Sequence, residues 1–363
     1  MEHHIEGRER HSENSGSSSS PTLFYLTRAE VAQALEQIDV VSVAADTLRA
    51  HGRGDTTVPD EAYMGWTTRD GHSARNLNMP GFIDGPERAI GTKIINASLG
   101  NTARGIPRAD GVTLLFDPET AHPYAMMDAA LISATRTAAV SVAAIEALAP
   151  RPVEVLGLIG CGTQSDTHLR LLLSRHAALR TVQVYDRDPS YAAAFAERHG
   201  AVAAAHGVKI TVMVDAEHAV RGADVVIPLT TVTEGYIRHA WLRPDAVVVH
   251  VSLDDLLPEV VLQASRLVVD DWNLVRSDPR RLLGRMYREG SLYWHGDTPP
   301  GPDAKAVDGE LGSYLNGEFP SGGLPGEGVT VVNPFGMSVQ DVALAHRVVA
   351  TARELGSGTH LAR

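Results

Sequence analysis

The sequence has one cysteine, few aromatic residues and no run of about 18 consecutive apolar residues, the length that spans a bilayer. A single cysteine, Cys161, cannot form an intramolecular disulfide, and it excludes a zinc site built from several cysteines. Aromatic residues make up 5% of the chain, which argues against a platform that stacks nucleic-acid bases. Since the N-terminus also lacks an apolar signal core, we expect a cytoplasmic protein.

Positive charge is also in deficit. The chain has 32 Lys and Arg against 44 Asp and Glu, a formal net charge of −12, which disfavours nucleic acid or membrane as a partner. The 16 histidines show no helical pair at metal-ligand spacing, so we predict no metal site. What is present is a chain of 363 residues, 44% of them hydrophobic, which is enough for two domains with buried cores.

Residues 1–20 are polar and rich in serine, and we predict that they form a disordered tail. The tetrapeptide Ile5–Arg8 spells a protease-tag sequence, so this stretch is either a tag remnant or a mobile extension. We assign it no function.

The second half of the chain alternates short apolar runs with helical stretches. Such alternation is typical of βαβ units in a parallel sheet that is covered on both faces. The chain therefore predicts a dinucleotide-binding domain of the Rossmann type over residues 149–330. The runs expected to form its strands are Val153–Ile159, Thr181–Tyr185, Val208–Val214, Ala223–Pro228, Ala246–Leu253 and Arg266–Val269.

The first half predicts several strands and a long helix from about Met127 to Leu148. The chain ends in another helix, Val339–Leu355, which we expect to return to this first domain. We predict an α/β protein in which a discontinuous α+β domain, residues 21–148 with 331–363, accompanies the Rossmann domain.

A glycine-rich turn follows the first apolar run of the second half. Gly160, Gly162, Thr163 and Gln164 open a helix, and Ser165 stands where the fingerprint usually has a third small residue. Such a loop lets a pyrophosphate approach the backbone at a helix N-terminus.

Asp186 ends the next strand, about 20 residues on, where an acidic side chain can bind the ribose hydroxyls. We predict NAD rather than NADP as the cofactor, although the adjacent Arg187 tempers the distinction; the alternative is a purely structural turn. Cys161, without a partner thiol, is interpreted as a loop residue.

Four segments occur in a fixed order: Asp117–Thr120, Pro123–Asp128, Ile132–Ser141 and Leu158–Gly162. In this order they resemble the ornithine cyclodeaminase/mu-crystallin family, and the resemblance extends from about Leu23 to Thr359. Within the family the chain is most similar to the NAD-dependent N-(2-amino-2-carboxyethyl)-L-glutamate dehydrogenases of 2,3-diaminopropionate biosynthesis, known from siderophore and antibiotic pathways. That narrower similarity rests on Val268–Trp272, Glu310–Gly312 and Asn333–Met337.

The resemblance implies an oxidoreductase that removes a hydride from a carbon bearing nitrogen. In the narrower group the imine is hydrolysed to 2-oxoglutarate and 2,3-diaminopropionate. In ornithine or lysine cyclodeaminases a side-chain amine attacks the imine and closes a ring instead. Cyclic imine reductases transfer hydride in the opposite direction, from the reduced cofactor to the imine carbon. A noncatalytic NAD(P)-binding protein of the mu-crystallin type is the remaining alternative.

The resemblance also implies roles for individual residues. Arg136 matches the carboxylate-binding arginine, whose planar fork suits a bidentate contact. Lys93 matches the substrate lysine, which the resemblance implies is both a substrate-binding and a catalytic residue. A lysine inside an apolar strand would be costly without an anionic partner. Asp255 matches the catalytic aspartate, with Asp254 as its competitor.

Softer matches concern the cofactor. Thr231 and Thr233 match positions that line the dinucleotide, and the segment from Asn333 to Met337 matches one that returns across the nicotinamide.

The chain also departs from the family pattern. Cyclodeaminases carry a glutamate just before the Met-Pro that is Met79-Pro80 here, and Asn78 in its place disfavours cyclisation. The narrower group has one or two cations around the segment Val58–Trp66, which has none. Either Arg75 binds substrate in their place, together with Met79, or the substrate has fewer carboxylates or is a different amine. The resemblance also implies a homodimer, and it implies that the discontinuous α+β domain serves substrate binding and dimerisation.

Overall fold

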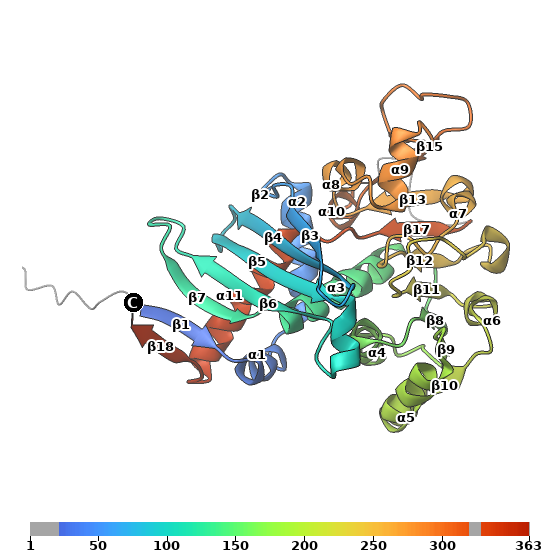
Figure 1. The fold of residues 1–363 in the computed structure, drawn as a ribbon. Coiled ribbons are helices and arrows are strands. Elements are labelled where there is room, and N and C mark those ends of the chain that lie inside the picture. Colours follow the sequence, from blue (N-terminus) through green and yellow to red (C-terminus); the bar gives the residue numbers. More distant parts are fainter. Residues whose placement is uncertain (1–21, 319–327, 363) are drawn as a thin grey trace, which may run out of the picture.

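The computed structural model describes residues 22–318 and 328–362, and the stretch 1–20 lies outside the described residues. Two eight-stranded sheets stand side by side and are joined by helices (Figure 1). The expected α/β class is confirmed, with one mixed sheet and one sheet whose strand pairs are all parallel.

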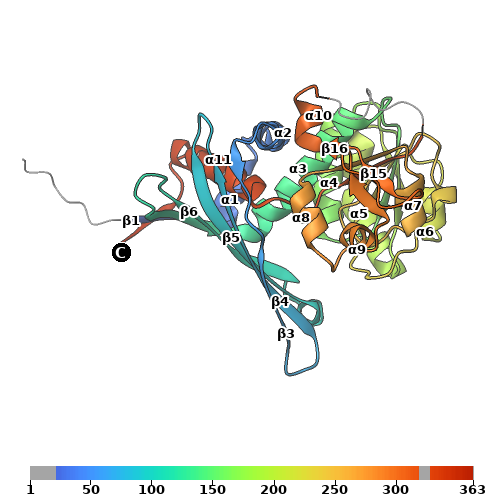
Figure 2. The same ribbon diagram turned by 90° about the horizontal axis from the view of Figure 1, so that it is seen from above.

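The first sheet has the order β18-β1-β7-β6-β5-β4-β2, with β3 paired to β4. Helices on one side of it include α11, whose residues contact β4, β5 and β6 (Figure 2). Its strands are β1 (Thr22–Leu26), β2 (Thr56–Thr57), β3 (Ala62–Thr67), β4 (Ser73–Ile83), β5 (Ala89–Ser98), β6 (Ala109–Phe116), β7 (Pro123–Asp128) and β18 (Thr359–Ala362). The accompanying helices are α1 (Arg28–Leu35), α2 (Val40–Gly52), the 3-10 turn η1 (Leu99–Arg104), α3 (Ala129–Leu148) and α11 (Ser338–Glu354).

Local chemistry sets the ends of these helices. Thr27 and Glu30 cap the start of α1 reciprocally, each side chain accepting a backbone N–H of the other residue. Asp128 caps α3 by accepting from the amide of Leu131. Because residues 123–128 pair with β1 and β6, the helix expected from Met127 begins two residues later, at Ala129.

The second sheet has the order β10-β9-β8-β11-β12-β17-β13-β16. Its strands are β8 (Val155–Ile159), β9 (Thr181–Tyr185), β10 (Lys209–Val212), β11 (Val225–Pro228), β12 (Val247–Val249), β13 (Arg266–Val269), β16 (Gly309–Glu310) and β17 (Thr330–Asn333). Its helices are α4 (Thr163–Arg175), α5 (Pro189–Ala205), α6 (Ala216–Val220), the 3-10 turn η2 (His239–Trp241), α7 (Pro258–Gln263), α8 (Trp272–Ser277), α9 (Leu282–Arg288) and α10 (Leu311–Leu315). A small pair, β14 (Leu292–Trp294) and β15 (Lys305–Val307), stands apart.

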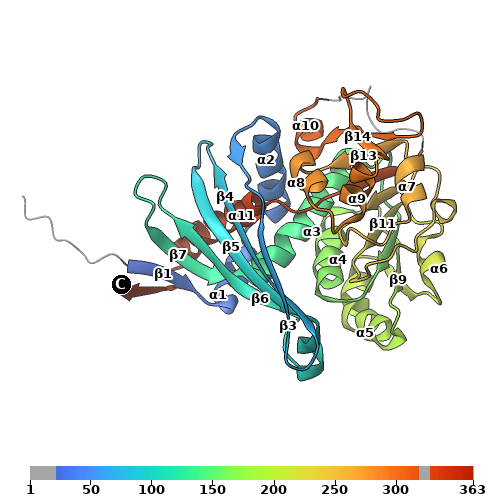
Figure 3. The ribbon, with the colours of Figure 1, turned by 45° about the horizontal axis from the view of Figure 1, so that its top comes forward.

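The chain crosses between the sheets twice, through α3 and through the segment after β17. Since β17 lies between β12 and β13, the boundary expected after residue 330 falls inside this strand. After Asn333 the chain returns to the first sheet as α11, which packs beside α2 and α3 (Figure 3). The second half of the chain therefore contributes to both parts of the fold.

Helix α3 is long and apolar enough to cross a membrane by length and composition, but 72% of its apolar window is buried inside the protein. It packs against α2, α4 and α11 and reaches β12 of the second sheet. It is therefore the shared core helix of the two parts.

Candidate active site and dinucleotide site

The glycine-rich turn lies at the carboxyl end of β8. Gly160 has a φ of +92°, and a Cβ there would meet the carbonyl oxygen of Leu229 at 2.8 Å, so the close approach of the two loops requires glycine. Ser165, at the third small position, is buried and donates a hydrogen bond to the Gly160 carbonyl. A hydroxyl thus holds the turn onto the helix that it opens.

Asp186 lies beside this turn because β8 and β9 are neighbours. Its carboxylate accepts from the amides of Cys161 (2.8 Å) and Asp188 (3.0 Å). The acidic residue and the turn are therefore fixed relative to one another. Arg187 next to it is exposed and makes no hydrogen bond or ion pair with any of the described residues.

The residues at this turn fit a dinucleotide. A Cβ on Gly162, the N-cap of α4, would meet nothing within 4 Å, so the helix N-terminus faces open space. Gln164 carries a buried side-chain oxygen without a hydrogen-bond partner among the described residues. Thr163 is exposed beside it. Open amides at a positive helix end suit a pyrophosphate, and the carboxylate of Asp186 suits ribose hydroxyls.

Cys161 is buried within the turn, and burial raises the pKa of its thiol to about 12. A neutral buried thiol is a poor nucleophile, which agrees with its interpretation as a loop residue.

A second cluster joins the two predicted substrate cations to one buried carboxylate. The Nζ of Lys93 on β5 lies 2.7 Å from Oδ2 of Asp341, and the Nε of Arg136 on α3 lies 3.3 Å from Oδ1. Asp341 is on α11 and is fully buried, and Lys93 is only 2% exposed. Lys93 also donates to the hydroxyl of Ser133 (3.2 Å).

The two cations Lys93 and Arg136 share one carboxylate, that of Asp341, so this buried cluster carries a net positive charge. Burial, followed by the charge of Arg136, lowers the pKa of Lys93 to about 8, although Asp341 opposes the shift. Such a site favours an incoming anion, because an anion would balance the surplus charge.

The segment that follows β17 passes directly over Arg136. Gly336 has a φ of +104°, and a Cβ there would meet the guanidinium of Arg136 at 2.8 Å. Asp270, at the end of β13, fixes this segment by accepting from the amides of Phe335 (2.9 Å) and Gly336 (2.7 Å). Burial raises the pKa of Asp270 to about 6.

Asn333 and Met337, the two ends of this segment, are both buried. Asn333 lies 3.3 Å from Nδ1 of His250, and Met337 packs in the hydrophobic core. Phe335 and Gly336 between them line a cavity with Met79, Glu61 and Ser338. Met79 pairs in register with Lys93, and Gly336, which lines the cavity with Met79, lies against Arg136. The predicted substrate residues Met79, Lys93 and Arg136 therefore lie near one cavity.

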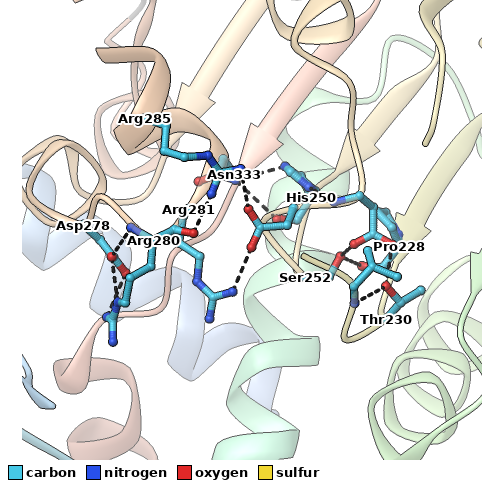
Figure 4. Close-up of polar contacts among 12 residues, drawn as sticks. Pro228, Thr230, His250, Ser252, Asp278, Arg280, Arg281, Arg285 and Asn333 are labelled. Atoms are coloured by element: carbon cyan, nitrogen blue, oxygen red, sulfur yellow. Dashed lines mark hydrogen bonds and ion pairs between the residues drawn. The ribbon is translucent and has the colours of Figure 1, made fainter. Parts of the chain in front are cut away.

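Asp254 and Asp255 follow β12, and their side chains have different partners, of which Figure 4 labels Arg281, Arg285, Thr230 and Ser252. Asp254 accepts from Arg281 and from Arg285, each at 3.0 Å, so it is neutralised by two cations. Asp255 accepts from the hydroxyls of Thr230 (2.7 Å), Tyr236 (2.8 Å) and Ser252.

Burial raises the pKa of Asp255, and its three hydroxyl partners only partly oppose that shift. A carboxylate that faces neutral donors can take up a proton more readily than one paired with arginines. The surroundings therefore favour Asp255 over Asp254 as the acid–base group. Its side chain is fully buried, on the side where the loops after β11 and β12 meet.

Three other predicted residues lie away from these contacts. Thr231 and Thr233 are exposed in the loop after β11, next to Thr230, which the sequence did not single out. Arg75 on β4 is partly buried and makes no hydrogen bond or ion pair with any residue in the described ranges.

Sequence reasoning missed the residues that hold the others in place. Asp341, Asp270 and the hydroxyls around Asp255 each support a residue that was predicted. Asp341 lies 205 positions from Arg136 in the chain, so no local spacing could have signalled their contact. The available sign was an aspartate at the fourth position of the helix that directly follows the Asn333–Met337 segment.

The fold and the turn after β8 define a dinucleotide-dependent oxidoreductase, and comparisons with known proteins narrow this class. The model of the ornithine cyclodeaminase/mu-crystallin family matches residues 24–355. The chain belongs to this family. It is an NAD-dependent oxidoreductase that acts on CH–NH donors.

Individual relatives cover almost the whole chain. It is 32% identical to the N-((2S)-2-amino-2-carboxyethyl)-L-glutamate dehydrogenase of Staphylococcus aureus (strain NCTC 8325 / PS 47), over 93% of this chain and 98% of the relative. It is 31% identical to the ketimine reductase mu-crystallin of Mus musculus, over 74% and 78%. The crystal structure of CmnK is similar with a TM-score of 0.85 at 40% identity, over 94% of this chain and 98% of that one.

Proposed function

We propose that the protein oxidises the carbon–nitrogen bond of N-(2-amino-2-carboxyethyl)-L-glutamate with NAD. Hydride leaves the glutamate α-carbon, and the resulting imine is hydrolysed to 2-oxoglutarate and 2,3-diaminopropionate. The reaction balances: the secondary amine, NAD⁺ and water give 2-oxoglutarate, 2,3-diaminopropionate, NADH and one proton. One observation carries the proposal: Lys93 and Arg136 share the single buried carboxylate of Asp341, which leaves a surplus positive charge for a carboxylate substrate.

Each residue has a defined part in this proposal. Lys93 and Arg136 bind the α-carboxylate beside Met79, and the Gly336 backbone closes over Arg136. Asp255, held by three hydroxyls, exchanges a proton with the substrate nitrogen or the attacking water. Bound NAD supplies the hydride acceptor, and the residues that would hold it are Gly160, Gly162, Thr163, Gln164, Asp186, Arg187, Thr231, Thr233, Asn333 and Met337.

A panel of three reactions tests the function. The glutamate adduct with NAD is expected to give NADH at 340 nm together with 2-oxoglutarate. Ornithine or lysine with catalytic NAD should release no ammonia, and a cyclic imine with NADH should be left unreduced. Ammonia without net NADH would reassign the protein to the cyclodeaminases, and NADH consumption by the imine to the reductases. Binding of dinucleotide with no turnover in any arm would indicate a noncatalytic protein.

We also propose a homodimer formed through the first sheet, in a cytoplasmic enzyme of specialised metabolism. The face of this sheet opposite α11 carries a partly exposed apolar surface. Monomers rarely leave so continuous an apolar surface to solvent, which supports a partner there. It is made by Phe82, Ile90, Ile94, Val112, Leu114, Phe116 and Met126. Sedimentation of wild type and of Leu114→Glu tests this, because the charged variant is expected to be monomeric.

A further inference from the structure

A fully buried histidine, His250, directly follows β12 and lies close to the two aspartates. Its Nε2 accepts a hydrogen bond from the backbone N–H of Asp255 at 3.1 Å. Asp255 is itself fully buried, and among the described residues its N–H has no other partner. Because a buried backbone amide needs an acceptor, this contact fixes the backbone from which the Asp255 side chain starts.

The imidazole of His250 is suited to accept this bond. A backbone amide can only donate, so Nε2 must be the unprotonated ring nitrogen. Burial, followed by the charge of Arg281, lowers the pKa of His250 to about 3. The ring is therefore neutral at physiological pH, and it keeps the lone pair that the Asp255 amide needs.

His250 also touches the start of the segment that passes over Arg136. Its Nδ1 lies 3.3 Å from the side-chain amide nitrogen of Asn333 (Figure 4). Its backbone N–H donates to the carbonyl oxygen of Val332, one residue earlier, at 2.7 Å. His250 therefore joins the backbone of Asp255 to the end of β17.

The loop between His250 and Asp255 has an unusual backbone conformation. Leu253 has a φ of +74°, in the left-handed region, and is buried. A residue with a side chain rarely adopts this conformation, which persists only where the surrounding contacts fix it. Ser252 supplies one such contact by donating to the carbonyl oxygen of Pro228 at 3.0 Å. The bond from Asp255 to His250 supplies another and closes the loop.

We propose that His250 is a positioning residue for the acid–base group. It fixes the Asp255 carboxylate relative to the segment over Arg136, where the substrate carboxylate binds. This inference rests on the proposed function, in which Asp255 exchanges the proton. Since a displacement of about 1 Å at a reacting group can lower a rate about 100-fold, loss of the contact between His250 and Asp255 should be measurable in kcat.

Two variants separate the roles of the two ring nitrogens. The side-chain oxygen of glutamine lies the same number of bonds from Cβ as Nε2 of histidine, so His250→Gln keeps an acceptor for the Asp255 amide. The side-chain amide of asparagine matches Nδ1 instead, so His250→Asn keeps only the contact with Asn333. For the glutamate adduct with NAD, we expect kcat to fall about 10- to 100-fold in His250→Asn with KM little changed. In His250→Gln, kcat should stay near the wild-type value.

The Asp255→Asn background tests whether His250 acts through Asp255. The acid–base group is already lost there, so adding His250→Asn should lower the rate of single-turnover hydride transfer no further. As a control, His199→Asn removes another buried imidazole, whose Nε2 contacts Asp166 on α4, and should leave kcat unchanged. NADH fluorescence and thermal unfolding of every variant show whether the dinucleotide site is folded.

The outcomes distinguish the two proposals. If wild type forms no NADH from the adduct, the proposed function and this role of His250 both fail. If wild type forms NADH, but His250→Asn and His250→Gln lose kcat equally or His250→Asn loses none, only the positioning role is overturned. An undiminished effect of His250→Asn in the Asp255→Asn background overturns that role as well.

Discussion

At the scale of single residues, the predicted site residues are positioned by hydrogen bonds and ion pairs to other buried residues. Lys93, Arg136 and Asp255 follow from similarity to a family, and the structure places Lys93 and Arg136 against Asp341. Asp255 lies within a set of hydroxyls from Thr230, Tyr236 and Ser252. These supporting residues could not be predicted, because each contact joins positions that are distant in the chain or carry no distinctive spacing.

The first prediction at this scale concerns pH. Because the pKa of Lys93 is lowered to about 8, its side chain is positively charged below that pH and loses its charge above it. We expect kcat/KM for the glutamate adduct to fall as the pH rises through about 8. Lys93→Arg keeps its charge at that pH, so its alkaline limb should move upward. An unchanged limb in the variant would assign the titration to another group.

The second prediction separates the neighbouring aspartates. Asp255→Asn cannot take up a proton, and kcat should fall by about 10²- to 10⁴-fold while NAD binding persists. Asp254→Asn removes the partner of Arg281 and Arg285, so it should lower stability with a smaller effect on kcat. Stopped-flow hydride transfer and thermal unfolding of both variants check this. The reverse ranking of kcat would make Asp254 the acid–base group.

At the scale of elements, buried strands were the most predictable. Thr181–Tyr185 and Arg266–Val269 have the predicted bounds. In the first strand polar and apolar residues alternate, and the second is a buried apolar run that begins with an arginine. The strand β18 was missed, since its strand character depends on pairing with β1 from the other end of the chain. The Gly/Pro-rich stretch before β17 likewise contains β15, β16 and α10, which tertiary contacts define.

A prediction for one helix contact follows from two glycines. A Cβ on Gly312 of α10 would lie 2.4 Å from the Leu48 carbonyl oxygen and 2.8 Å from the Gly52 amide, both on α2. Gly312→Ala should therefore destabilise the protein by about 1–3 kcal/mol. Gly200→Ala on α5 meets nothing within 4 Å and should be neutral or stabilising by up to about 1 kcal/mol. Urea unfolding of the two variants measures the difference, and equal stabilities would contradict the close packing.

At the scale of the whole molecule, a largely buried pair of side chains links the two parts in addition to the packing of α3. Nε2 of His51 on α2 lies 3.2 Å from Oδ2 of Asp271, which follows β13 and caps α8. Burial opposes charge on His51, but the hydrogen bond and charge of Asp271 raise its pKa above the usual value. The sequence predicted two parts of the chain and a strand over Gly328–Val332, which the structure has as β17 (Thr330–Asn333), but not the contacts that join the two parts.

This pair predicts a pH-dependent stability. Because the pKa of His51 is raised by folding, its contribution is full below the unfolded pKa of about 6.5 and is lost as the pH rises through the folded value. His51→Asn should therefore cost about 1–3 kcal/mol of apparent stability at pH 6 and less at pH 9. His72→Asn is the control, since His72 is exposed and 3.9 Å from Asp70. A loss that is equal at both pH values would exclude an ionic role.

The most direct test of the central claim follows the hydride itself. The glutamate adduct, carrying deuterium on its glutamate α-carbon, is incubated with NAD, and NADH and 2-oxoglutarate are examined by mass spectrometry. We predict one deuterium in the reduced nicotinamide for each 2-oxoglutarate formed, because hydride leaves the carbon that bears nitrogen. Unlabelled NADH, or deuterium returned to a cyclic product without net NADH, would contradict the account.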